Sequence, residues 1–133
     1  MRVAMGMAST VLVLAAIYGP PASAESPVPP EVPLGGVMFI DNPAIVDPHP
    51  MRVESWSRVA GDNSINVNFT SGTDTCYGVH ATVRETDETI TVDLQGGTLP
   101  EAVDRACIMI ALFGTLEVPL EGPLGDRRLL SAT

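Results

Sequence analysis

The two histidines are the side chains best suited to acid–base chemistry at neutral pH, and neither has evident partners. Nucleophilic catalysis needs a serine or threonine beside a histidine, with an acid behind the ring. His80 falls on the polar side of an alternating run, together with Thr82, and this position is typical of a surface histidine. His49 lies between Pro48 and Pro50, in an extended segment where rigid positioning is difficult. We therefore expect neither histidine to be catalytic.

Motifs that name other reactions are also missing from the sequence. The chain has no Gly-x-Ser-x-Gly element, no phosphate-binding glycine loop and no His-Glu-x-x-His. The acids Glu85, Asp87 and Glu88 cluster in a turn, where carboxylates are usually solvated. Asp62-Asn63 lacks the alternating oxygen ligands and the closing glutamate of a calcium loop. The sequence therefore predicts no catalytic residue, no metal ligand and no cofactor.

The chain contains two cysteines, Cys76 and Cys107, so only one intramolecular disulfide is possible. Two cysteines and two scattered histidines do not form a zinc site at this spacing. A redox pair would normally have the Cys-x-x-Cys spacing. We expect a structural disulfide that closes a loop of about 32 residues and stabilises the fold by roughly 3–4 kcal/mol.

A turn near the C-terminus is the most distinctive local element. Pro123, Gly125, Asp126 and Arg127 follow an expected strand and precede the last one. An aspartate in a turn typically accepts hydrogen bonds from the backbone amides of that turn. We expect Asp126 to do so, and Arg127 to form a paired charge against the sheet. A binding site at this turn is the alternative.

The first 24 residues have the pattern of an export signal. Arg2 supplies a positive charge, residues 3–18 form an apolar run, and two prolines precede the Ala22-Ser23-Ala24 cleavage pattern. The run is too short for a spanning helix of about 20 apolar residues. We expect residues 1–24 to be a signal peptide cleaved after Ala24, which leaves a secreted, extracytoplasmic chain without a membrane span. An uncleaved leader that anchors the chain is the alternative.

Composition narrows the possible partners. The net charge is −9 over the whole chain, and it becomes −10 once residues 1–24 are removed, because they contain Arg2 and no acid. Nucleic acids and anionic lipid surfaces need a basic face, so both are disfavoured. A basic partner is possible, but dispersed acids also keep a secreted domain monomeric. We expect a monomer.

Proline content and periodicity divide the rest of the chain. Residues 25–50 contain seven prolines and are expected to form a linker, with an edge strand or flap at 37–40. Residues 51–133 are expected to form one β-domain. Apolar residues alternate with polar ones over 65–70, 77–84, 90–94 and 116–120, and this period is typical of strands with one wet face. The fold class is mainly all-β, a small antiparallel sandwich or barrel of six to seven short strands, with one helical turn near 100–106 that leads into a strand.

Three short pieces together resemble a known group of proteins. Cys76-Tyr77-Gly78-Val79, Cys107-Ile108 and Pro123-Leu124-Gly125-Asp126-Arg127 are similar to segments of small secreted or lipid-anchored actinobacterial envelope proteins of the mycobacterial type. The resemblance extends over about residues 56–128. It implies a disulfide-bearing β-domain displayed at the cell envelope, and it implies no reaction.

Together these features predict a non-catalytic secreted cell-envelope domain that acts by binding a protein or a ligand. A small secreted hydrolase, whose catalytic residues meet only in the folded chain, is one alternative. A carrier that binds cations or ligands on its acidic surface is another. A pocket above about 300 Å³ lined by His80 and an acid would favour the hydrolase. An exposed apolar patch around Phe39 or Phe113 would favour a binding domain.

Overall fold

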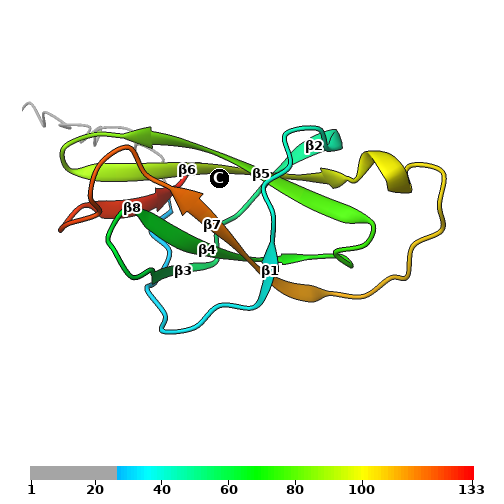
Figure 1. Ribbon diagram of the computed structural model, residues 1–133, viewed down its shortest axis with the longest axis horizontal. Coiled ribbons are helices and arrows are strands. Elements are labelled where there is room, and N and C mark those ends of the chain that lie inside the picture. The colour runs from blue at the N-terminus through cyan, green and yellow to red at the C-terminus, as the bar shows by residue number, and fades with distance from the viewer. Residues whose placement is uncertain (1–26) are drawn as a thin grey trace, which may run out of the picture.

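The computed structural model describes residues 27–133, so the predicted signal peptide at 1–24 lies outside the described residues. Two β-sheets pack face to face in a sandwich, and eight strands are present within the described part of the chain (Figure 1). The first sheet has the order β1 (Val37–Phe39), β7 (Leu112–Pro119), β4 (Ser64–Ser71) and β3 (Ser55–Arg58). The second has β6 (Thr89–Thr98) at its centre, flanked by β5 (Tyr77–Glu85), β2 (Val46–Met51) and β8 (Arg128–Ser131). The prediction of a mainly all-β sandwich or barrel is confirmed as a sandwich, with one or two strands more than expected. The strands are mainly antiparallel as predicted, but β1 pairs with β7 and β8 pairs with β6 in parallel.

The core fills the space between the two sheets. Alternate residues of β4, β6 and β7 point inward and are almost completely buried, as the period-two pattern predicts. Phe39 of β1 packs edge-to-face on Phe69 of β4, with ring centroids 5.2 Å apart. The fully buried side chains of this core include Ile65, Val67, Phe69, Val79, Ile90, Val92, Leu94 and Leu116.

The prediction that residues 25–50 form a linker is wrong for their described part. Residues 30–32 pair with Trp56 of β3, β1 runs parallel to β7, Asn42 donates to the carbonyl of Val79, and β2 lies antiparallel to β6. Only the expected edge strand near 37–40 is confirmed. Prolines exclude a segment from the centre of a sheet, but edge strands accept them because one row of amides there needs no partner.

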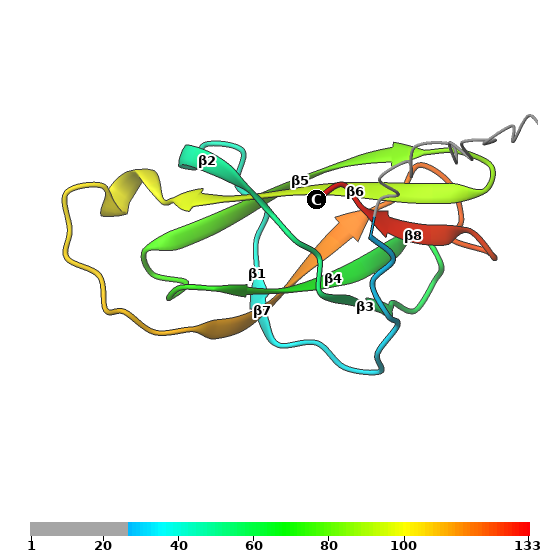
Figure 2. The ribbon, with the colours of Figure 1, turned by 180° about the vertical axis from the view of Figure 1, so that it is seen from behind.

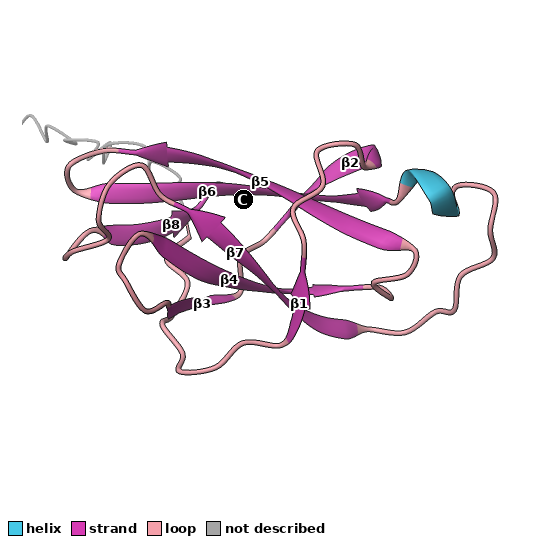
Figure 3. Ribbon diagram, in the orientation of Figure 1, coloured by secondary structure: helices cyan, strands magenta, loops and turns pink. Residues whose placement is uncertain are grey.

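A long connection joins the two sheets at one end of the sandwich. The expected helical turn is confirmed as a single 3-10 turn at Pro100–Ala102. The expected strand immediately after it is not formed, because residues 103–111 cross from the second sheet to the first as a loop before β7 begins at Leu112 (Figures 2 and 3). Within residues 27–133, no helix has the length and apolar character needed to cross a membrane.

Candidate functional site

A groove of about 670 Å³ opens between the two sheets beneath the 103–111 loop. Three parts of the chain form it: the ends of β2 and β6 with the start of β5, the end of β4, and the loop itself. Its lining residues are His49, Pro50, Met51, Thr70, Ser71, Gly72, Tyr77, Gly96, Gly97, Ile108, Met109, Ile110 and Ala111. We call this feature the mouth.

Strand register explains why these side chains meet. Met51 pairs with Leu94 and His49 pairs with Gly96, so both residues lie on the face of β2 that points toward the core. Tyr77 lies two residues before the buried Val79 on β5 and therefore shares its inward face. The mouth is thus the place where the inward faces of both sheets continue beyond the packed core.

Two glycines give the mouth its shape. A Cβ atom on Gly96 would lie 2.1 Å from the Met51 sulfur, so only glycine lets that side chain rest on β6. A Cβ atom on Gly72 would lie 2.4 Å from the Tyr77 ring. Side chains at these positions would therefore push Met51 and Tyr77 out of their present places.

The loop presents three consecutive apolar side chains to solvent. Ile108, Met109 and Ile110 expose 65%, 94% and 47% of their surfaces. Phe113, at the start of β7, is also about half exposed on the outer face of the first sheet. Single exposed apolar residues are ordinary, whereas a contiguous group beside a groove is typical of a binding surface.

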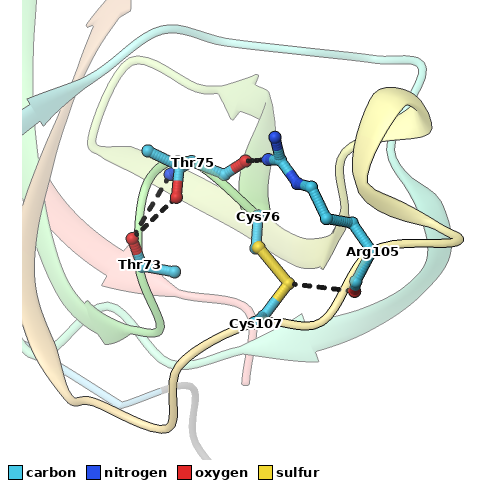
Figure 4. Close-up of a disulfide and its surroundings, with 5 residues drawn as sticks. All are labelled: Thr73, Thr75, Cys76, Arg105 and Cys107. Carbon is cyan, nitrogen blue, oxygen red and sulfur yellow. Dashed lines mark hydrogen bonds between the residues drawn. A yellow bond between two sulfur atoms is a disulfide. The ribbon is translucent and has the colours of Figure 1, made fainter.

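The disulfide fixes this loop to the second sheet. Cys76 and Cys107 are bonded as expected. The Arg105 guanidinium also donates a hydrogen bond to the carbonyl of Thr75, the residue before Cys76 (Figure 4). The loop is therefore held near its middle by a covalent bond at Cys107 and at its end by β7, and its apolar residues 108–110 lie between these two anchors.

The polar side chains of the mouth are few, and none is a carboxylate, an ammonium or a guanidinium group. The lining residues with polar side chains are Thr70, Ser71, Tyr77 and His49. The Thr70 hydroxyl donates to a carboxylate oxygen of Glu54 at 2.8 Å, outside the lining. Among the lining residues there is no carboxylate, lysine or arginine. A small hydrogen-bonding set in an apolar groove can orient a ligand.

His80 lies away from the mouth, on the outer face of β5. Its Nδ1 atom is 3.0 Å from a carboxylate oxygen of Asp41, which also accepts a hydrogen bond from the amide of Ala81. This contact attaches the segment between β1 and β2 to the edge of β5. Within residues 27–133, no three His, Cys, Asp or Glu side chains are grouped closely enough to hold a metal ion.

The C-terminal turn is present, but Asp126 does not have the predicted role. Asp126 is exposed and accepts no hydrogen bond within the described part of the chain. The amide of Gly125 donates instead to the carboxylate of Asp62, which belongs to the loop between β3 and β4. The sequence indicated Asp126 because the backbone amides of a turn usually find their hydrogen-bond acceptor within that turn. Here the acceptor comes instead from a neighbouring loop.

Arg127 and Glu85 form the centre of this turn. The Arg127 guanidinium lies 2.9 Å from a Glu85 carboxylate oxygen and also donates to the carbonyls of Gly122 and Pro123. Burial alone would raise the pKa of Glu85. The amide of Glu121, the Arg127 guanidinium and the amide of Gly122 outweigh that effect, so the pKa of Glu85 is lowered. The expected paired charge of Arg127 is confirmed.

Comparison with protein-family models, with curated proteins and with solved structures finds no match for this chain. Its own geometry is therefore the evidence for function.

The sequence did not predict the mouth. The signals that could have indicated it are Gly96-Gly97 inside a strand, which is typical of a close approach by another group, and the apolar run 108–110 after a cysteine.

Proposed function

We propose that this chain is a non-catalytic secreted cell-envelope domain that acts by binding, and that the mouth is its binding site. The observation that carries the proposal is an apolar groove of about 670 Å³ bordered by the exposed side chains of Ile108, Met109 and Ile110. Exposing such side chains to water is unfavourable, and covering them with a bound partner or ligand removes that cost.

The extracytoplasmic location has two supports. The sequence begins with the pattern of an export signal that ends at Ala24. The disulfide between Cys76 and Cys107 is typical of a chain that folds in an oxidising compartment. Both features agree with the resemblance to actinobacterial envelope proteins.

The two alternatives have less support. A hydrolase would need an acid to orient a histidine beside a nucleophile, and His49 shares the mouth with hydroxyls but with no carboxylate. His80 does contact an acid, Asp41, but this pair attaches one segment to a strand edge outside the mouth. A cation carrier would use clustered carboxylates, and the described residues hold no such group.

Capture of envelope material by the exported chain, tagged at its C-terminus, tests the proposal. The variant Ile108→Ser/Met109→Ser removes the most exposed apolar surface of the mouth. The matched control Met38→Ser/Ile40→Ser removes comparable surface elsewhere, since Met38 and Ile40 are 54% and 89% exposed. We expect wild type and control to retain the same bound material, and the mouth variant to lose most of it.

Equal retention by both double variants would overturn the assignment of the site to the mouth. Loss in the control alone would move the site to the β1 edge. Thermal unfolding of all three chains checks that the differences come from binding, because exposed substitutions of this kind change stability by only about 0.5 kcal/mol.

A further inference from the structure

We infer that the mouth takes an uncharged, elongated apolar ligand, of the kind presented by the acyl chain of a neutral lipid. This inference rests on the proposed function and names the class of ligand for the same site. Its evidence is the chemistry of the lining, the volume of the groove and the charge around it.

Volume and shape favour a small molecule over a protein surface. Sites for small ligands are concave, mostly apolar and about 300–1,000 Å³ in volume, and the mouth, at about 670 Å³, lies within that range. Met51, Tyr77 and the 108–111 segment form walls around a space left open between two sheets. A flat protein partner would leave this space unfilled, whereas a chain-like ligand can enter it.

The lining has no group that would pair with a charged ligand. A carboxylate or phosphate inside the mouth would need an arginine or lysine, because an unpaired charge removed from water is strongly unfavourable. Of the arginines near the mouth, Arg105 already donates to the carbonyl of Thr75. Arg52 lies outside the lining, in a surface recess beside Met51 that also contains Glu54. An ammonium group would need an acid, and no acid lines the mouth.

The surroundings also disfavour an anion. The mature chain carries a net charge of −10 once Arg2 is removed with the leader. Close to the mouth, the carboxylate of Glu54 accepts a hydrogen bond from the hydroxyl of the lining residue Thr70. Like charges raise the free energy of an anionic head group near this rim. Hydroxyls and an imidazole can instead satisfy the hydroxyl or ester oxygens of an uncharged head group.

Displacement of Nile red, an uncharged apolar dye, provides the test. The disulfide-bonded chain is first titrated with the dye, and three competitors of equal chain length are then compared below their micellar concentrations. They are 1-monomyristoylglycerol, myristate and tetradecyltrimethylammonium. We expect saturable dye binding, and displacement by the monoacylglycerol at a concentration at least tenfold lower than by either charged compound. Failure to bind the dye, or stronger displacement by a charged compound, overturns the inference.

A filled mouth gives the matched control. Ala111 lines the groove and is exposed, so Ala111→Phe should weaken dye and monoacylglycerol binding at least tenfold. Ala60→Phe places the same side chain in the exposed turn between β3 and β4 and should change neither. If Ala111→Phe unfolds, Met109→Ser replaces it, with a smaller loss expected. Unchanged affinity in the folded mouth variant overturns the inference.

The proposed function and this inference can fail separately. If the chain captures envelope material through Ile108 and Met109 but binds neither dye nor monoacylglycerol, the ligand class is wrong and the binding site remains. If the dye binds but capture is insensitive to the mouth variant, the envelope-binding proposal fails and the groove chemistry remains.

Discussion

Replacing Arg127 with methionine should destabilise the fold clearly more than replacing an exposed arginine, although Arg127 lies in a turn. The Arg127 side chain is only 14% exposed and that of Glu85 only 11%. Methionine keeps most of the aliphatic volume but removes the guanidinium. Glu85 then keeps its backbone donors from Glu121 and Gly122 but loses its ion-pair partner.

The expected cost is about 3 kcal/mol in the free energy of unfolding. Removing one member of a buried ion pair typically costs about 3–5 kcal/mol, because the remaining charge is left without its partner. The pair lies at the edge of the sandwich, where water can reach Glu85 after the substitution, so the lower end of that range applies. The carbonyls of Gly122 and Pro123 also lose a donor, and each such loss contributes about 1 kcal/mol or less when water can replace it.

Urea unfolding of the disulfide-bonded chain at neutral pH measures this cost. Arg128→Met is the matched control, because Arg128 is exposed and forms no ion pair within the described residues; its effect should stay within about 0.5 kcal/mol. Arg127→Met/Glu85→Gln should lose less than the sum of the two single variants, since neither charge is left alone. A loss below about 1 kcal/mol for Arg127→Met would refute the argument.

Three further predictions concern the same framework. Reducing the bond between Cys76 and Cys107, which are 31 residues apart, should cost about 3–4 kcal/mol in a thermal or urea unfolding experiment, and an unchanged transition would contradict the expected role of the bond. Asp126→Ala should leave the unfolding midpoint unchanged. Asp62→Ala removes the acceptor for the Gly125 amide and should lower the free energy of unfolding by about 1 kcal/mol. The reverse result would mean that Asp126, and not Asp62, stabilises the turn. Because the native pKa of Glu85 is lowered, its stabilising effect is complete above its unfolded pKa of about 4.3 and is lost as the pH falls through the lower native value. Glu85→Gln should therefore flatten the decline in stability that wild type shows below about pH 4, and an unaltered pH profile would count against the pair.

The alternation of apolar and polar residues predicted the central strands correctly, because a strand that buries one face needs an apolar side chain at every second position. Ile65, Val67 and Phe69 alternate with polar residues, and they are the inward residues of β4. The cysteine pairing was equally constrained, since only one bond was possible. In contrast, the prolines of residues 25–50 made this segment resemble a linker, because proline has no amide hydrogen to donate within a sheet. Pro48 and Pro50 nevertheless lie in β2, and an edge strand accepts proline.

The mouth could not be predicted because it depends on contacts between segments far apart in the sequence. Met51 meets Gly96 only because β2 pairs with β6. The sequence around residues 108–110 fits both helical and strand spacing, whereas in the structure residues 103–111 form the loop that crosses between the sheets. The role of Asp62 at the C-terminal turn was hidden for the same reason, since 63 residues separate it from Gly125.

Methionine methyl NMR tests the central claim most directly, because the described residues include methionines inside and outside the mouth. Met51 and Met109 line the groove, whereas Met38 lies on β1 outside it. The chain, labelled at its methionine methyl groups, is titrated with a delipidated protein fraction and then with a lipid extract of the producing cell's envelope. The proposal predicts that the protein fraction or the lipid extract shifts or broadens the Met51 and Met109 signals and leaves the Met38 signal in place. Three unchanged signals, or a change at Met38 alone, would contradict it.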